Sequence, residues 1–441
     1  MSDEELRALE RAASETNDAA SWLRVAQAAG RSGKGDEAGH AVVRARSLGG
    51  DPFPVLDVLA PPTLDAFTVR ELGKRFELGK LWFTAWSPDA RTIYAVENKK
   101  AVLAIDAATG ERHTILVLLG EATAFAADAA GGRLALGLVT PEKRKLVNGV
   151  GVVDLATGKL ESVGRGHAWI QQVALAGETV LCAEKNRLRG YRHEVEKEKS
   201  SLSLKGTSAL DATGAFAITF GFELRLHSPA SLEPRATVHL DVPAEALARF
   251  HLACAGERTV LLAEDLVLLE KDGSPRARAK VPGAGSVYGI EPSPSGRHVA
   301  IFWTEGGQRT THFDLLDVTS ARARRIDLAG RPRWASWSPS GQRLAIPTDQ
   351  GTIALVEAAA SAAPPEKPKP VADEGWVELR SSQRFWRGRQ LGALIEFHHG
   401  GLGTRGTRGA TPCVDADEAR RELERRIQEK LAGGYAHIRS P

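Results

Sequence analysis

Arginine and glycine residues are concentrated near the C-terminus, where their chemistry suits the binding of phosphate or another anion. Three arginines precede a strand-like segment, and two more stand in the glycine-rich stretch 400–409. Guanidinium groups and the backbone amides of such loops both donate hydrogen bonds to anionic oxygens. The tentative nucleic-acid-binding residues are Arg384, Arg387, Arg389, His399, Arg405 and Arg408. Two alternatives stay open, a solubilising basic surface on an interaction module and a site for other anionic ligands.

The positive charge of the chain is confined to this C-terminal part. Residues 376–441 contain twelve Lys or Arg and eight Asp or Glu, a net charge of +4, whereas the rest of the 441-residue chain is near −1. The helix expected over 416–431 contributes little, because its arginines alternate with glutamates at helical spacing. The whole molecule therefore has no general attraction for nucleic acid.

Recognisable catalytic motifs are missing from the sequence. It contains no Gly-x-Ser-x-Gly, no phosphate-binding Gly-x-x-x-x-Gly-Lys-Ser/Thr and no His-Glu-x-x-His. His398 and His399 are adjacent, so on a strand they point to opposite faces and chelate one ion poorly. We predict no catalytic residue, no metal and no cofactor, and therefore no enzyme. The alternative is an enzyme whose catalytic residues are scattered over separate loops.

A repeat of about forty residues organises the middle of the chain. Its clearest copies are Trp86–Ala95 (WSPDARTIYA) and Trp337–Ile346 (WSPSGQRLAI). Weaker copies turn on Gly132, Gly177, Gly214, Gly256 and Gly296. Seven copies of a turn followed by an apolar run predict the four-stranded blades of a seven-bladed β-propeller over residues 64–357.

The last copy leaves little room for a fourth strand after residues 352–356. The segment Phe67–Leu72, ahead of the first copy, has an unused strand-like pattern. We expect it to pair with the last blade, because that pairing closes the ring and removes an exposed sheet edge. Two charged segments, 140–145 and 192–199, are expected to be solvated loops.

Helical spacing, without strand alternation, runs through residues 4–48. Gly30, Gly33 and Gly35 divide it into two predicted helices, and the stretch 49–52 ends the second. Trp22, followed by Ala38 where two helices must approach closely, resembles one tetratricopeptide repeat. A single unit cannot form the groove of such an array, so residues 1–52 are either a packing cap or spacer, or an element for partner binding or self-association.

The propeller repeats resemble those of WD-repeat and TolB-like propellers. Trp-Ser-Pro-Asp and Trp-Ser-Pro-Ser fit the TolB-like style, and Gly166-His167 fits the Gly-His pair of WD repeats. The resemblance implies a rigid platform for protein partners, bound by loops at the ring ends. His167 itself is expected to be structural.

The linker 358–375 is rich in alanine and proline, so residues 376–441 form a separate module. Strands are expected first, with 393–397 central, and then a helix over 416–431. Phe385-Trp386, the stretch 400–406, Ala419 and the ending 429–435 resemble a WGR domain, the small module found in poly(ADP-ribose) polymerases. His399 and Gly401 replace the family's Trp and Arg, so the module is a degenerate WGR-like domain of α+β type.

The remaining features indicate a cytoplasmic protein, and the richness in Ala, Gly and Arg indicates a bacterial one. The N-terminus lacks a signal-peptide pattern, no apolar run approaches a membrane span, and the three cysteines have no metal-type spacing. Cys182 and Cys254 are expected to be buried thiols. We therefore predict a multidomain, mainly β protein that acts as a non-catalytic scaffold, binding unidentified protein partners through the propeller and the helical segment. The alternative is a protein that contacts DNA phosphates through the WGR-like domain.

Overall fold

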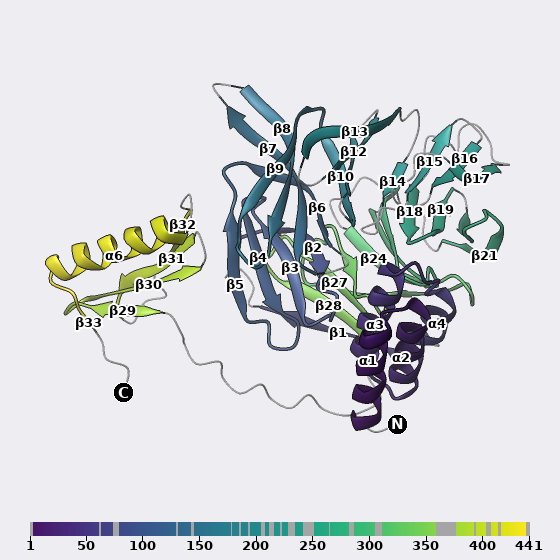
Figure 1. Cartoon of the computed structure of the whole chain (residues 1–441), viewed down its shortest axis with the longest axis horizontal. Coiled ribbons are helices and arrows are strands. Elements are labelled where there is room, and N and C mark those ends of the chain that lie inside the picture. The colour runs from purple at the N-terminus through teal and green to yellow at the C-terminus, as the bar shows by residue number, and fades with distance from the viewer. Residues whose placement is uncertain are drawn as a thin grey trace.

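The fold is mainly β, with a group of helices at the N-terminus and one long helix near the C-terminus (Figure 1). The computed structural model describes residues 3–437 except for residues 61–62, 74–78, 129–130, 143–144, 178, 185–186, 193–194, 204–207, 211–215, 221–222, 228–233, 241–250, 264, 282–285, 305–310, 359–375, 392–393, 403–406 and 413–415.

Among the described residues, seven antiparallel sheets of four strands follow one another along the chain. Six sheets use consecutive strands: β2–β5 (Leu81–Trp86, Thr92–Glu97, Ala101–Asp106, Arg112–Val117), β6–β9 (Glu121–Ala127, Arg133–Glu142, Lys145–Asp154, Leu160–His167), β10–β13 (Ile170–Ala176, Thr179–Glu184, Arg187–Arg192, Val195–Ser203), β14–β17 (Ser208–Leu210, Phe216–Phe220, Glu223–His227, Pro234–His239), β18–β21 (His251–Ala255, Arg258–Leu262, Asp265–Leu269, Pro275–Lys280) and β22–β25 (Ser286–Pro292, His298–Thr304, Thr311–Asp317, Arg322–Arg325). The seventh sheet contains β26 (Ser336–Trp337), β27 (Arg343–Pro347), β28 (Ile353–Ala358) and β1 (Phe67–Leu72).

The first strand of each sheet contacts the first strand of the next sheet. These contacts run from β2 through β6, β10, β14, β18, β22 and β26, and then return to β2. A series of four-stranded sheets whose inner strands close on themselves is a β-propeller. The predicted seven-bladed propeller is therefore confirmed.

The ring is closed by the strand that the sequence left unused. Strand β1 pairs antiparallel with β28, so that Phe67 lies opposite Ala358 and Leu72 opposite Ile353. Phe67 is fully buried, and its ring meets those of His298 and Trp337 edge-on. The predicted closure is confirmed, and it joins two segments almost 290 residues apart.

Tight turns at the repeat markers explain why those residues recur. Ala90 and Gly341 lie between the first and second strands of their blades, with φ of 55° and 72°. Glycine adopts such angles without steric cost, whereas alanine does so rarely. In the second blade the positive φ is at Gly131 rather than at the marker Gly132, and Gly214 lies outside the described residues.

The tryptophans of the two clearest copies connect neighbouring blades. The indole of Trp86 donates a hydrogen bond of 2.9 Å to the carbonyl of Ser336, and that of Trp337 donates one of 3.0 Å to the carbonyl of Glu291. Each indole thus satisfies its buried N–H on the inner strand of the preceding blade. The motif fixes the contact between blades as well as the turn within one.

Two segments expected as loops belong to strands. Residues 140–142 are the end of β7, and β8 begins at Lys145, so these two ten-residue strands form a long hairpin. Likewise β13 begins at Val195 inside the second charged segment. For the described residues both loop predictions are wrong, because their backbones pair in antiparallel ladders, Glu142 with Lys145 and Arg192 with Val195.

The N-terminal segment forms more helices than its glycines predict. Helices α1 (Asp3–Thr16), α2 (Ala19–Arg31) and α3 (Gly35–Ser47) replace the expected pair, and α4 (Phe53–Leu59) and the 3-10 helix η1 (Leu64–Ala66) follow. The additional break comes at Asp18, whose carboxylate caps α2 by accepting the Ser21 N–H at 2.9 Å. Within the described part of the chain, no helix is long and apolar enough to cross a membrane.

The C-terminal module is a sheet with one helix across it (Figure 1). Its strands are β29 (Val377–Arg380), β30 (Arg384–Leu391), β31 (Leu394–Gly401), β32 (Thr407–Pro412) and β33 (Ala436–His437), in the spatial order β32-β31-β30-β29-β33. Helix α6 (Ala416–Ala432) contacts β30 and β31. Strands first and then a helix from residue 416 agree with the sequence prediction.

Candidate functional site

A channel runs along the axis of the propeller and is lined by the first strand of every blade. Its volume is about 750 Å³, and residues of β2, β6, β10, β14, β18, β22 and β26 contribute to its wall. Because these strands all run in the same direction along the axis, their first residues meet at one mouth and their hairpin turns at the other. The two mouths have different surroundings.

Helix α3 closes the mouth formed by the hairpin turns, which we call the capped end. Val42, Val43 and Arg46 of this helix line the channel beside the turn residues Pro88 and Pro339. The fit is close, because a Cβ atom on Gly39 would lie only 2.8 Å from the backbone nitrogen of Ser340. Larger side chains are therefore excluded at this position of α3.

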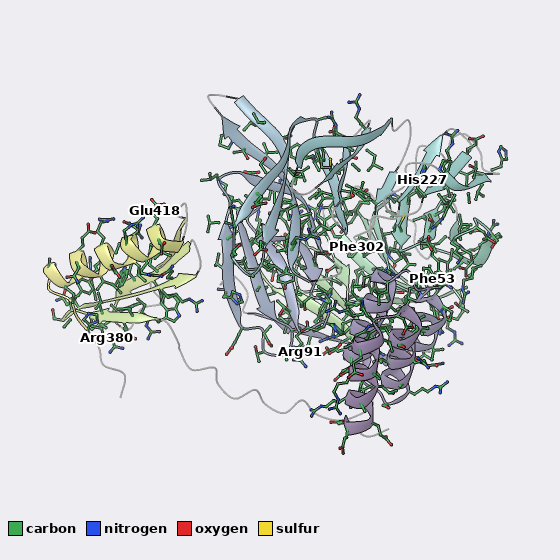
Figure 2. The ribbon with its side chains drawn as sticks, viewed as in Figure 1. Phe53, Arg91, His227, Phe302, Arg380 and Glu418 are labelled. Carbon is green, nitrogen blue, oxygen red and sulfur yellow. The ribbon has the colours of Figure 1, made fainter. Side chains whose placement is uncertain are left out.

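Ion pairs hold the helices on the capped end. Arg258, only 3% exposed, donates hydrogen bonds to both carboxylate oxygens of Asp57 in α4 at 2.7 and 3.1 Å and lies over the ring of Phe53. Phe53, the first residue of α4, is labelled in Figure 2. Arg343 donates to Asp36 of α3 at 2.6 Å. Each pair joins an acidic helix residue to a basic propeller residue, so the two parts are electrostatically complementary.

The other mouth, which we call the open end, exposes aromatic side chains. Trp169 is 53% exposed, Trp334 is 58% exposed and Tyr288 is 38% exposed, and all three line the channel. Burial raises the pKa of Tyr288 to about 12, so its hydroxyl stays neutral near pH 7. Large aromatic side chains are seldom grouped on a surface that water covers, and they are enriched at protein interfaces.

Basic residues surround the aromatic side chains of the open end. The ammonium of Lys99 and the guanidinium of Arg333 each lie 4.4 Å from the ring centre of Trp82. The backbone N–H of Trp334 donates to the carbonyl of Trp82 at 3.1 Å, which brings the two tryptophans together at the blade 7–blade 1 junction. The open end is thus both aromatic and cationic.

The interior of the channel is mainly apolar. Its wall carries the apolar side chains of Phe83, Phe125, Val173, Leu252 and Ile290. Burial lowers the pKa of His251, a polar residue of the wall, so this imidazole is neutral near pH 7. No group of three or more His, Cys, Asp or Glu residues suited to a metal occurs in the described portion of the chain.

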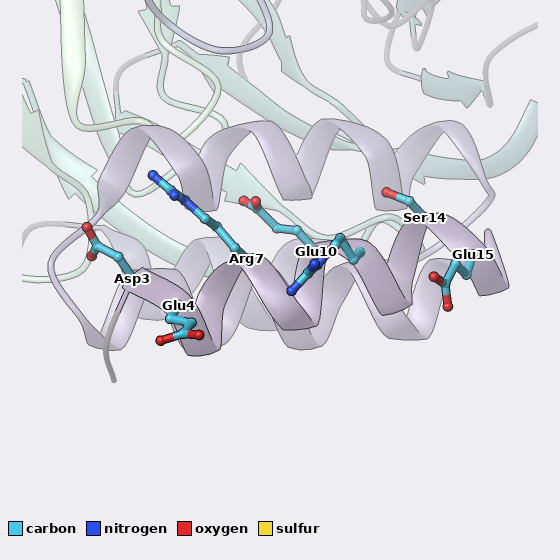
Figure 3. Close-up of a pocket in the computed structure, with 7 residues that line it drawn as sticks. Asp3, Glu4, Arg7, Glu10, Ser14 and Glu15 are labelled. Atoms are coloured by element: carbon cyan, nitrogen blue, oxygen red, sulfur yellow. The ribbon is translucent and has the colours of Figure 1, made fainter.

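A second depression lies on the outer surface of α1 and is no site (Figure 3). Its lining residues, Asp3, Glu4, Arg7, Glu10, Arg11, Ser14 and Glu15, all come from this one helix. Acidic and basic side chains alternate there, and Asp3 pairs with Lys34. No side chain from another element converges on them with chemistry beyond a solvated helix face.

The arginines and the histidine predicted to bind nucleic acid do not form one cluster. In β30, Arg384 lies on the same face as Trp386, which is buried toward α6, whereas Arg387 and Arg389 lie on the opposite face. His399 pairs in register with Trp386, so it also lies on the helix side. Strand alternation therefore separates residues that are close in sequence.

The remaining predicted residues are only partly described. Arg408, in β32, pairs in register with His398 of β31, although the side chain of Arg408 lies outside the described atoms. Arg405 lies outside the described residues. Arg387 contacts Glu378 at 2.9 Å, and the guanidinium of Arg389 lies 4.8 Å from the ring centre of Trp376. The open face of this sheet is therefore mixed in charge, with aromatic neighbours.

Of the three cysteines, Cys182 is buried and Cys254 is half-buried, and neither forms a disulfide bond among the described residues, whereas Cys413 lies outside them. The backbone of His167 is the end of β9, and its side chain is outside the described atoms.

The aromatic residues of the open end were missed at the level of sequence. Their signal is position: Trp82 is the second residue of β2, and Trp169 directly precedes β10. A large aromatic side chain at the start of an inner strand projects toward the axis only once all blades are in place. A search for tryptophan or tyrosine near that repeat position would have found them.

No family model matches this chain, and no curated protein is similar to it in sequence. Similar chains are numerous among solved structures. One of them, from the crystal structure of a mitotic checkpoint complex, is 12% identical with a TM-score of 0.47, over 68% of this chain and 92% of its own length. The assignment of the propeller rests on the strand order and the closed ring of inner strands described above.

Proposed function

We propose that this protein is a non-catalytic adaptor that binds protein partners at the open end of the propeller channel. The observation that carries the proposal is the exposure of Trp169, Trp334 and Tyr288 around an apolar channel whose other mouth is closed. A few residues carry most of the binding energy at a protein interface, and tryptophan, tyrosine and arginine are enriched among them. An exposed group of these residues is costly in water and is compensated when a partner covers it.

The chemistry of the channel supports a binding role rather than an enzymatic one. Its described wall is largely apolar, and His251 and Tyr288 are both held in their neutral forms. General acid–base catalysis needs groups whose pKa lies near the working pH. Here burial moves these two groups away from that range.

The helical segment is proposed as a packing cap with a tetratricopeptide-like hairpin inside it. Helices α2 and α3 pack against each other, with Trp22 and Ala38 in their shared core. The acidic side chains Asp36 and Asp57 point to the propeller. The surfaces that a repeat array would offer to a peptide are thereby partly used within the chain.

The C-terminal module is proposed as an accessory interaction module of WGR-like type. A second candidate function, contact with DNA phosphates, is favoured by one observation: Arg387 and Arg389 lie on the sheet face opposite α6, together with Phe385. Aromatic and guanidinium groups on an open sheet suit nucleic acid. The ion pair with Glu378 weakens this candidate relative to the adaptor function.

Site-specific photocrosslinking tests the adaptor function. Benzoylphenylalanine replaces Trp169 or Trp334 in the full chain, and as a control replaces Val58, which is 64% exposed on α4. Irradiation in cells of the source organism is expected to give discrete protein adducts from the two mouth positions and not from position 58. Equal adducts from all three positions, or none from the mouth, would count against the proposal.

Fluorescence anisotropy tests the second candidate function. The ligand is a nicked duplex with a 5′-phosphate, at low and physiological salt. DNA contact predicts binding that weakens with salt and with Arg387→Glu plus Arg389→Glu, but not with Arg421→Glu on the exposed side of α6. Equal binding by the parent, the double variant and the Arg421→Glu control would mean that any DNA contact lies elsewhere.

A further inference from the structure

The basic residues of the open end are incompletely neutralised. Within the described part of the chain, no carboxylate pairs with the guanidinium of Arg331 or Arg333, and the buried Nε of Arg333 has no hydrogen-bond partner. Asp349 is close, but its carboxylate accepts the backbone N–H of Arg331 at 2.9 Å. Lys99 is 4.0 Å from Glu121, a contact too long for a strong pair.

At the capped end, by contrast, the basic residues are paired with carboxylates. Arg258, Arg276 and Arg343 there each meet a carboxylate of the helical cap within 3 Å. A guanidinium that is partly removed from water gains from a carboxylate partner and costs stability without one. At the capped end, carboxylates of the chain itself pair with the arginines. At the open end, the guanidinium groups of Arg331 and Arg333 can pair with carboxylates from another molecule.

The same cations decide which ligands the aromatic residues suit. An aromatic cage for a methylated lysine or another quaternary ammonium attracts a cation to the ring faces. In this structure Lys99 and Arg333 already lie over Trp82, and Arg333 is in the loop leading to Trp334. A second cation would be repelled, whereas an anionic ligand would be attracted.

The channel behind the mouth favours a peptide over a nucleic acid. Phe83, Phe125 and Ile290 line it with apolar surface, which accommodates a large apolar side chain. The polar edges of a base would lose their hydrogen bonds to water against such a wall. Proteins that bind single-stranded nucleic acid have a basic groove that follows the phosphate backbone. Lys99, Arg331 and Arg333 lie around the mouth of the channel and do not form such a groove.

We propose that the open end recognises an acidic peptide segment of a partner protein. Carboxylates of that segment pair with Arg331 and Arg333, and one large apolar side chain enters the channel between Trp169, Tyr288 and Trp334. This specificity rests on the proposed adaptor function and defines the chemistry of the partner.

Selection of peptides from a random twelve-residue phage library on the immobilised full chain tests the specificity. Enriched sequences are expected to combine several Asp or Glu residues with one aromatic residue or leucine. A synthetic copy of an enriched peptide is then titrated by fluorescence anisotropy. Arg331→Glu with Arg333→Glu should weaken its binding by at least about tenfold, since close charge pairs at interfaces couple by about 1.5 kcal/mol or more.

Two control variants separate charge from folding. Arg322→Glu reverses an exposed arginine on the outer strand β25 and should leave binding unchanged. Arg331→Gln with Arg333→Gln removes the charge without reversing it and should give an intermediate loss. Thermal unfolding of each variant is followed by circular dichroism, and only variants that unfold as the parent does are compared.

The outcomes distinguish the specificity from the adaptor function. Enriched peptides that lack acidic residues, but lose binding with Trp169→Ser and Trp334→Ser, would overturn the acidic preference and leave the adaptor function standing. If the full chain enriched no peptides beyond those enriched by the double variant Trp169→Ser with Trp334→Ser, both the acidic specificity and the adaptor function would be overturned. A labelled oligothymidine of twenty nucleotides that binds at Arg331 and Arg333, where acidic peptides do not, would overturn the proposal in favour of nucleic acid.

Discussion

The two ends of the propeller channel are built from the same repeat but differ in what covers them. At the capped end, Asp36 and Asp57 of the helices neutralise Arg343 and Arg258, and helix α3 fills the mouth. At the open end, Trp169 and Trp334 are more than half exposed and the nearby guanidinium groups lack such partners. The basic residues of the capped end are paired within the chain, whereas the open end is suited to binding a second molecule.

This difference separates stability from binding. Changes at the capped end should alter the free energy of unfolding, because they create cavities or unpaired charges. Changes at the open end should alter binding and leave the free energy of unfolding nearly unchanged. Four variants test that division, in order of decreasing expected effect.

Phe67→Ala should have the largest effect. The side chain is fully buried where β1 closes the ring, against His298 and Trp337. Replacing a buried phenylalanine by alanine costs about 3–5 kcal/mol. Urea unfolding monitored by tryptophan fluorescence measures the loss. Val69→Ala, on the same strand but 40% exposed, should cost clearly less, and equal losses would mean that closure does not depend on this anchor.

Arg258→Ala should destabilise the cap. Removing the arginine takes the buried partner away from Asp57 and Glu270, which keep their contacts with Arg276. Their side chains are 29% and 26% exposed and regain some water. We expect about 2–3 kcal/mol, below the roughly 3–5 kcal/mol of a fully buried pair, together with faster proteolysis of the helical segment. Arg276→Ala, which contacts the same two carboxylates from a 41% exposed position, should cost less than about 1 kcal/mol.

His298→Leu should stabilise the protein and flatten its pH dependence. Among the described residues, neither imidazole nitrogen of His298 has a hydrogen-bond partner. Burial lowers its pKa from 6.5 to about 4, with Arg297 acting in the same direction and Asp317 opposing it. Between these values the unfolded chain binds a proton that the folded chain does not, so stability falls as pH decreases from 6.5 to 4.

The leucine variant removes both the unpaired nitrogens and the titration. We expect a gain of about 1 kcal/mol near pH 7, which widens toward pH 4.5 in thermal unfolding scans. His239→Leu, at an exposed position, serves as the control and should follow the parent protein. If the stability difference between His298→Leu and the parent narrowed at low pH, the result would contradict a buried neutral histidine at position 298.

Trp169→Ser combined with Trp334→Ser should have the smallest effect on stability. Both side chains are mainly in water, and surface substitutions of this kind change the free energy of unfolding by about 0.5 kcal/mol or less. Urea unfolding of the double variant should therefore nearly superimpose on that of the parent, although the mouth has lost its aromatic surface. A loss approaching that of Phe67→Ala would show that these tryptophans belong to the core.

Local features of the chain were largely predictable from its sequence. The repeat identifies the blades because each described copy contains a turn with a positive φ, as at Ala90 and Gly341, followed by an apolar strand. The spare strand at residues 67–72 follows from counting strands, since an unpaired edge is unfavourable. Helix α6 begins at residue 416 as expected because its periodicity is continuous. The split of Arg384 from Arg387 and Arg389 also follows from alternation along a strand, once the strand is known to span all three.

The sequence by itself determined the repeat, the ring and the charge of the C-terminal module, because those depend on neighbours along the chain. Only the tertiary structure decided which mouth is covered and which is open. The pair between Arg258 and Asp57 spans about 200 residues, and Trp82 meets Arg333 across about 250. Such contacts exist only after the last blade has closed on the first, so no local pattern encodes them.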